Sequence, residues 1–143
     1  MRSLATLTAA AAVVILALLS PAMAQANWPA WKAELSASVK EKEVGITNLA
    51  TLYRDKRCPF VSDEQAKNDC QGQYDLMIFN RSLEKKLLEK IIAAIGLPEK
   101  DRDLLVNNLF PIYKEIEQRT NSEIDTLKDR FPEPQKAAEL EKK

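Results

Sequence analysis

Apolar residues recur every three or four positions along most of the chain, and no segment alternates between apolar and polar residues long enough to indicate a strand. This spacing places apolar side chains on one face of an α-helix. It predicts three long helices, near residues 28–57, 62–95 and 98–131. Their apolar faces comprise Trp28, Trp31, Leu35, Val39, Ile46, Leu49 and Tyr53 in the first helix, Ala66, Cys70, Tyr74, Met77, Ile78, Leu88, Ile91, Ile92 and Ile95 in the second, and Leu105, Leu109, Ile112, Ile116, Ile124, Leu127 and Phe131 in the third.

Proline, glycine and capping residues mark the predicted helix ends. Cys58-Pro59 ends the first helix, because the residue before a proline is pushed out of the helical region. Ser62 and Gln65 have the spacing of a capping box, which would start the second helix. Gly96 is expected to end that helix in the left-handed conformation that glycine adopts without strain.

The connections between the predicted helices are short, and short connections make neighbouring helices antiparallel. We therefore predict an all-α fold, an elongated up-down-up three-helix antiparallel bundle with coiled-coil-like packing. Pro111 lies inside the third helix and is expected to kink or split it, because its ring clashes with the preceding turn. A bundle this narrow leaves part of its apolar faces uncovered, and a second copy of the chain could cover them as a homodimer.

The first 24 residues have a different composition. Met1-Arg2 supplies a positive charge, an apolar stretch runs from Leu4 to Leu19, and small residues follow at Ala22-Met23-Ala24. This order is typical of a secretory signal peptide cleaved after Ala24, and Ala26 marks a second acceptable site. The alternative, a membrane anchor, needs about 20 apolar residues. We therefore predict a periplasmic or secreted protein with a bundle domain over 25–134 and a charged tail over 135–143.

Cys58 and Cys70 are the only cysteines of the chain, and they lie twelve positions apart. In an oxidising compartment two cysteines most simply form one disulfide. The alternative is a redox-active pair, but such pairs have two residues between the cysteines and lie near a strand–helix–strand unit. We therefore predict a structural disulfide.

The composition excludes several kinds of chemistry. The 143 residues correspond to a single domain and contain no histidine, which excludes Ser-His or Cys-His catalysis and histidine-ligated haem or zinc. Two cysteines cannot hold an iron–sulfur cluster, and the three scattered glycines form no phosphate-binding loop. Because 21 basic residues balance 21 acidic ones, no net charge favours nucleic acid as a partner. We expect a protein that is not an enzyme and has no cofactor and no metal.

Polar residues interrupt the apolar faces at one level of the predicted bundle. Lys42 does so in the first helix, and Arg81 and Glu84 do so in the second. Pairing the helices around their connections brings these three residues together beside Pro111. They could extend to solvent from the bundle edge, form a buried polar layer that fixes the register, or line a groove for a ligand or partner. The charged sequence neighbours of Lys42 and Glu84 favour the solvent edge.

Trp28 and Trp31 form a second candidate site at the start of the first helix. Tryptophan is enriched among the residues that dominate protein interfaces, so an exposed pair would mark an interface. Their three-residue spacing also places both rings on the predicted core face. We favour packing in the core for this pair.

These features together favour a non-enzymatic protein that works through contacts with another cell-envelope protein. A secretion-system component or an immunity or inhibitor protein would have such a character. One alternative is a periplasmic stress chaperone that holds unfolded proteins on an apolar surface. A second, less favoured alternative is a carrier that binds a small ligand in a mid-bundle groove.

Overall fold

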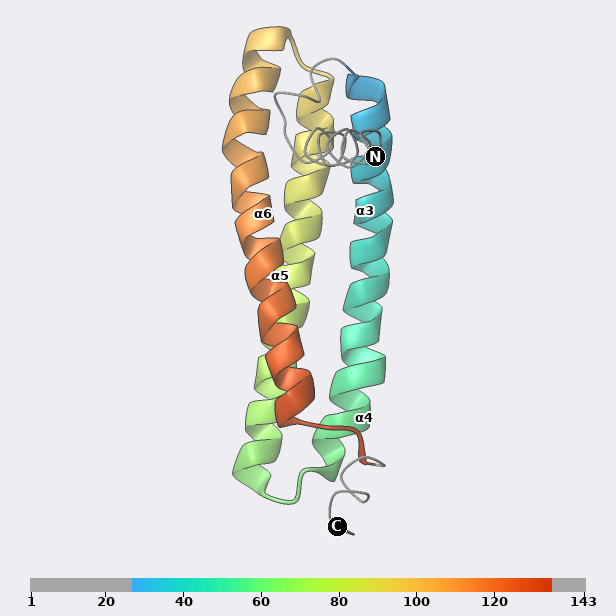
Figure 1. Cartoon of the computed structure of the whole chain (residues 1–143), viewed down its shortest axis with the longest axis vertical. Coiled ribbons are helices and arrows are strands. Elements are labelled where there is room, and N and C mark those ends of the chain that lie inside the picture. The colour runs from blue at the N-terminus through green and yellow to red at the C-terminus, as the bar shows by residue number, and fades with distance from the viewer. Residues whose placement is uncertain (1–26, 135–143) are drawn as a thin grey trace, which may run out of the picture.

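The computed structural model describes residues 27–134, which are almost entirely helical and contain no strand. Three long helices lie side by side along the molecule (Figure 1). They are α3 (Trp28–Asn48), α5 (Glu64–Ile95) and α6 (Glu99–Arg130). The first is prolonged by a π-helical turn, η1 (Leu49–Arg54), by α4 (Asp55–Arg57) and by a 3₁₀ turn, η2 (Cys58–Phe60). The predicted all-α fold with three long helices is confirmed.

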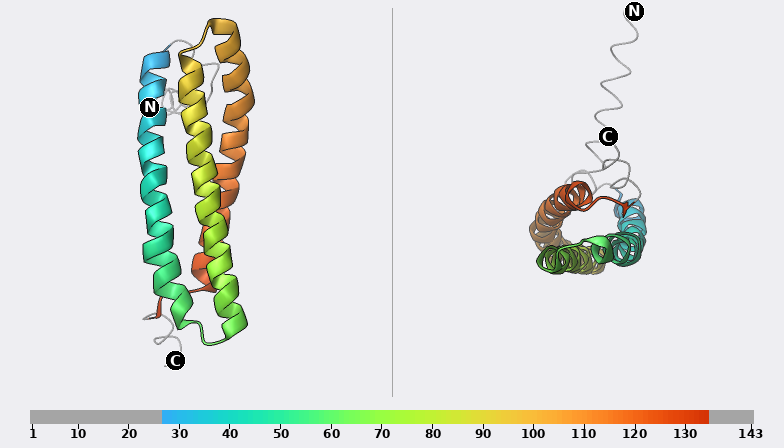
Figure 2. Two further views of the ribbon diagram at one scale, coloured as in Figure 1. Left: turned by 180° about the vertical axis from the view of Figure 1, so that it is seen from behind. Right: turned by 90° about the horizontal axis from the view of Figure 1, so that it is seen from below.

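The two connections between the long helices lie at opposite ends of an elongated molecule (Figure 1). Viewed along the long axis, the three helices occupy the corners of a triangle (Figure 2). α5 packs along both of its neighbours, whereas α3 and α6 come close to each other at few positions. One side of the triangle is therefore less tightly packed than the other two.

The ends of α5 differ in detail from the predicted ones. Asp63, and not Ser62, caps the first turn, and its Oδ2 accepts a hydrogen bond of 2.8 Å from the backbone N–H of Ala66. Aspartate is as good a cap as serine, and its charge also suits the positive end of the helix dipole. Gly96 has a φ of −79°, so the predicted left-handed conformation is wrong. Its N–H instead donates to the carbonyl of Ala93, and this tightened last turn ends the helix without a left-handed residue.

The apolar interior forms two clusters, one toward each end of the molecule. The upper cluster contains Trp31, Leu35, Leu87, Leu88, Ile91, Ala94, Val106, Phe110 and Tyr113. The lower cluster contains Leu49, Cys58, Cys70, Tyr74, Met77, Ile124, Leu127 and Phe131. The residues between them in sequence include the polar positions that interrupt the predicted apolar faces.

The upper half of α6 is rotated by about one residue from the predicted orientation. Leu105 and Ile112 are exposed, and the positions that follow them by one residue face the core. The ring of Phe110 packs edge-on against Trp31, with 5.4 Å between the ring centroids, so aromatic packing decides which face is buried. The buried residues of α6 are Val106, Phe110, Tyr113, Thr120, Ile124 and Leu127.

Helix α6 continues without interruption through Pro111, so the helix is not split there. A bend of its axis at this proline stays a prediction. At the other end of the molecule, Cys58 of η2 and Cys70 of α5 form the predicted disulfide. Both cysteines are fully buried in the lower cluster, and the bond ties the end of the first helical segment to the second turn of α5.

The predicted signal peptide over 1–24 and the predicted charged tail over 135–143 lie outside the described residues. Within 27–134, none of the helices combines the length and the apolar character needed to cross a membrane.

Candidate functional site

Four charged residues from all three long helices meet at the middle of the molecule, and we call them the charged layer: Lys42, Arg81, Glu84 and Glu117. Nζ of Lys42 lies 3.4 Å from Oε2 of Glu84 and 2.7 Å from Oε2 of Glu117. Nη1 of Arg81 donates to both carboxylate oxygens of Glu84, at 3.0 and 2.8 Å. Glu84 therefore has a cation on either side.

The charged layer lies inside the protein. The side chain of Glu84 is fully buried and that of Lys42 is 9% exposed, so the favoured solvent-edge interpretation is wrong for both residues. Pairing the predicted helices around their connections correctly placed Lys42, Arg81 and Glu84 at the same height along the bundle. Burial follows from packing: α5 packs along both of its neighbours, and the carboxylate of Glu84 faces Lys42 of α3.

Sequence reasoning missed Glu117, although a signal was available. The pairing of α5 with α6 placed Arg81 level with Tyr113, and Glu117 lies one helical turn further along the same face. Buried carboxylates and ammonium groups need partners to offset the loss of water, so a second acid on α6 is what two cations on α3 and α5 require.

Two further side chains of α6 hold Glu117 in place. The hydroxyl of Tyr113 donates to its Oε2 and Nζ of Lys114 donates to its Oε1 at 2.7 Å. Nζ of Lys42 also lies 5.7 Å from the centroid of the Tyr113 ring, over its face. Both carboxylate oxygens of Glu117 therefore accept hydrogen bonds.

The surroundings fix the charge state of the Glu117–Tyr113 pair. Burial by itself would raise the pKa of Glu117, but hydrogen bonds from Lys114, Lys42 and Tyr113 outweigh it and lower that pKa to about 2. The pKa of Tyr113 is raised, first by burial and then by its hydrogen bond to Glu117. Glu117 is therefore ionised and Tyr113 protonated across the whole neutral range, which gives a constant pattern of charge and hydrogen-bond donors.

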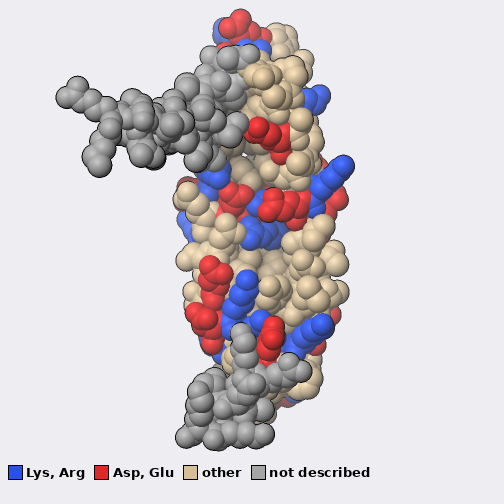
Figure 3. Space-filling view, turned by 45° about the vertical axis from the view of Figure 1, so that its right-hand side comes forward, with Lys and Arg blue, Asp and Glu red and all other residues tan. Residues whose placement is uncertain are grey.

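Three cavities lie where the first helical segment, from α3 to η2, faces α6 or the residues that follow α6, and we call them together the α3/α6 groove. The upper cavity, about 250 Å³, and the middle one, about 420 Å³, share Glu117 as a wall. The lower and largest cavity has a volume of about 670 Å³. In a space-filling view, charged side chains form a band across the middle of the molecule, and further charged side chains lie below and above it (Figure 3).

The middle cavity opens onto the charged layer. Lys42, Arg81 and Glu117 form part of its lining, and Asn48 and Asn121 contribute amide groups. The side-chain oxygen of Asn121 accepts a hydrogen bond from Nη2 of Arg81. The floor of the groove at this level is therefore polar, and the charged layer connects it to the interior.

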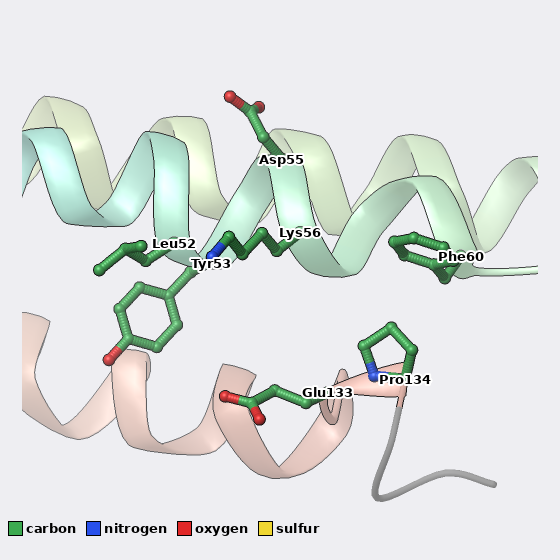
Figure 4. A pocket seen from close by; sticks show the side chains of 7 residues that line it. All are labelled: Leu52, Tyr53, Asp55, Lys56, Phe60, Glu133 and Pro134. Atoms are coloured by element: carbon green, nitrogen blue, oxygen red, sulfur yellow. The ribbon is translucent and has the colours of Figure 1, made fainter.

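The lower cavity has apolar and aromatic walls, and the charged residues Asp55, Lys56 and Glu133 complete its lining (Figure 4). Leu52 and Tyr53 come from the π-helical turn, and Phe60 and Pro134 lie at the far end of the cavity. Leu52 is 45% exposed and Phe60 is 68% exposed. A π-helical turn takes one extra residue, which changes the side chains that face a neighbour, and such turns are frequent at functional sites.

Two cations lie close to the ring of Tyr53 in this lower region. The guanidinium of Arg57 is 5.0 Å from its centroid and Nζ of Lys128 is 5.1 Å away. Arg57 is itself held by the carbonyl oxygen of Phe131 at 2.8 Å, so the chain after α6 is tied to α4. These contacts therefore hold Tyr53 and Arg57 in place beside the lower cavity.

The two tryptophans of the second candidate site lie at the upper end. Trp31 is buried in the upper cluster, and Trp28 packs against it with 5.6 Å between the ring centroids. The guanidinium of Arg102 lies 4.5 Å from the Trp28 centroid. Trp31 therefore presents almost no surface, and the half-buried Trp28 is covered in part by Arg102.

Among residues 27–134, no group of three or more acidic, histidine or cysteine side chains is placed to hold a metal ion. No family model, curated protein or solved structure matches this chain.

Proposed function

We propose that this chain is an exported, non-enzymatic binding protein that receives a segment of another cell-envelope protein in the α3/α6 groove. The observation that carries this proposal is the set of cavities that make up the α3/α6 groove, with exposed apolar side chains at Leu52 and Phe60. Apolar groups held in water beside a preformed cavity favour association with a partner.

The proposed location is the periplasm or the extracellular space. A buried disulfide suits an oxidising compartment, and the signal-like pattern of the first 24 residues suits export. In the proposed mature protein the helices form an up-down-up bundle in which a bend at Pro111 would adjust the width of the groove.

The charges in the site support binding better than turnover. Glu117 and Tyr113 keep one protonation state through the neutral range, and the chain has no histidine to move protons there. The groups facing the groove are instead held by neighbours in fixed positions, which favours selective docking.

The test uses two phenylalanines of similar exposure on different faces. A photo-reactive phenylalanine analogue would replace Phe60, which is 68% exposed and lines the groove, or Phe79, which is 64% exposed and lies on α5. In native cells we expect illumination to join position 60 to a defined envelope protein and position 79 to none. Cross-linking from both positions to the same products, or from position 79 alone, would contradict the proposal.

A second candidate function is the transport of a small apolar ligand. The lower cavity, at about 670 Å³, is within the size range of small-molecule sites and has aromatic walls. A carrier purified from its own cells would show a bound mass in a native mass spectrum, and replacing Leu52 by a charged residue would remove it. A single protein mass in that spectrum would favour the docking of a protein segment.

A further inference from the structure

We propose that the outward side of α6 binds a second copy of this chain, so that two α6 helices pack antiparallel in a homodimer. None of the residues on this side lines the three cavities of the α3/α6 groove, so the dimer goes beyond the proposed function and does not depend on it. Three features of α6 support it: the spacing of its exposed residues, the apolar centre that they form, and the opposite charges at their two ends.

The outward side of α6 carries residues with the spacing that packed helices use. The helix occupies one corner of the triangle, so part of its surface faces neither neighbour (Figure 2). Six residues of α6 follow one another at alternating steps of four and three positions, and all six are exposed: Asp101, Leu105, Asn108, Ile112, Glu115 and Arg119. We call them the outer seam. Such a seven-residue repeat aligns side chains along one line of a helix, and paired helices pack along such lines.

The centre of the outer seam is apolar and has no charge. No charged residue occurs from Leu104 to Tyr113. Leu105 and Ile112 of the seam are 39% and 48% exposed, and the adjacent Leu104 is 62% exposed. The rotation of upper α6 keeps these side chains out of the core of their own bundle. Their apolar surface is therefore in contact with water, and covering it with another molecule is favourable.

The charges at the ends of the outer seam favour an antiparallel second copy as the occupant. Asp101 lies at the N-terminal end and has no ion-pair partner among the described residues, since the neighbouring Arg102 pairs with Asp103. Arg119 lies at the C-terminal end, 18 residues or about five helical turns later, so it points to the same side as Asp101. An antiparallel copy places Arg119 opposite Asp101 at both ends. A parallel copy would place each charge opposite its own kind, which is unfavourable.

The same antiparallel arrangement pairs every position of the outer seam. The first position faces the sixth, the second faces the fifth and the third faces the fourth, as the twofold symmetry of a homodimer requires. Each seam side chain then inserts among four residues of the facing helix. Leu105 packs between Ile112 and Ile116 of the second copy, beside the aliphatic stem of Glu115. The two Asn108 amides meet near the symmetry axis, where each can donate to and accept from the other.

Sedimentation equilibrium of the oxidised protein, purified after export, measures this association. We expect the mass to rise with concentration from one copy to two and no further, with a dissociation constant on the order of 100 μM. Ile112→Asp places a charge in the apolar centre and should weaken association about tenfold or more. Leu76→Asp is the matched control, because Leu76 is 49% exposed on α5 and lies outside the outer seam, and it should leave association unchanged. Circular dichroism of dilute samples checks that both variants keep their helices.

A charge exchange tests the antiparallel orientation. At low salt Arg119→Asp should weaken association about tenfold, because Asp101 of the second copy then faces an aspartate at both ends. Adding Asp101→Arg to this variant should restore the dissociation constant to within about threefold of the parent value. A parent protein that stays monomeric, or association that Ile112→Asp leaves unchanged, would overturn the inference. So would an Arg119→Asp variant that associates like the parent, or a combined variant that associates no more tightly than Arg119→Asp alone.

Discussion

Two ion pairs formed by adjacent residues of the same two helices have opposite environments. Lys42 and Glu84 pair in the interior, with their side chains 9% and 0% exposed. Their sequence neighbours Glu43 and Lys85 pair on the surface at 3.0 Å, with side chains 53% and 30% exposed. The same two kinds of side chain, one residue apart, are therefore part of the core in one case and part of the solvated surface in the other.

The difference arises from helix geometry and from the number of partners. Consecutive residues of a helix point about 100° apart, so a charged neighbour in sequence says little about where a side chain points. Inside the protein a single opposite charge does not offset the loss of water, and Lys42 and Glu84 have additional partners in Glu117 and Arg81. On the surface, water solvates both charges, so one weak ion-pair partner is enough.

The largest expected effect comes from breaking the buried pair. Glu84→Ala leaves Lys42 and Arg81 without their shared anion, and we expect a loss of about 3–5 kcal/mol in the free energy of unfolding. Urea unfolding followed by circular dichroism measures it. Met77→Ala serves as a control for simple loss of buried volume in the neighbouring cluster. A loss within error of the parent protein would mean that the charged layer is hydrated.

Reducing the disulfide removes a constraint at the lower end and leaves the charged layer in place. We expect Cys58→Ser together with Cys70→Ser to cost up to about 3 kcal/mol in the chain-entropy account. Helicity should persist, because the apolar faces remain. Urea unfolding of this double variant, with and without Glu84→Ala, should give additive losses, since the sites are far apart. Two reactive thiols in the untreated protein would contradict the disulfide itself.

Acid should weaken the buried layer through Glu117. Its folded pKa of about 2 lies below the usual value of 4.5, so its contribution is complete above about pH 4.5 and is lost as the pH falls toward 2. We expect a loss of about 2 kcal/mol over this range, less than the full shift would give because the carboxylate keeps some contact with water. Glu117→Gln should flatten this part of the stability–pH curve, whereas Glu43→Gln should leave it unchanged. Identical curves for both variants would refute the assignment.

The smallest effect is expected from the surface pair. Glu43→Ala should leave the urea midpoint within error of the parent value, because an exposed ion pair gains little over two hydrated charges. Added salt should cancel any remaining difference between variant and parent. A midpoint shift comparable to that of Glu84→Ala would show that exposure does not separate the two pairs.

The sequence predicted the helices well and their orientation less well. Three-residue and four-residue spacing located the three long helices, and the two cysteines gave the disulfide. The rotation of upper α6 could not be predicted, because Leu105 and Val106 are equally apolar and the packing of Phe110 on Trp31 decides between them.

The candidate site was predicted only in part, because packing between helices decides which side chains are buried. Helix pairing brought Lys42, Arg81 and Glu84 to one level, but charge patterning along the chain wrongly suggested a solvent edge. The π-helical turn that presents Leu52 has no local sequence signal, and the looser packing between α3 and α6 depends on how all three helices pack.

The most direct test of this account is a pair of double-mutant cycles that compare the buried and the surface ion pair. One cycle combines Lys42→Met with Glu84→Gln, and the other combines Glu43→Gln with Lys85→Met, all measured by urea unfolding under one set of conditions. We expect a coupling energy of about 2 kcal/mol or more for the buried pair and none that can be measured for the surface pair. Equal couplings in the two cycles would contradict a buried charged layer beneath the groove.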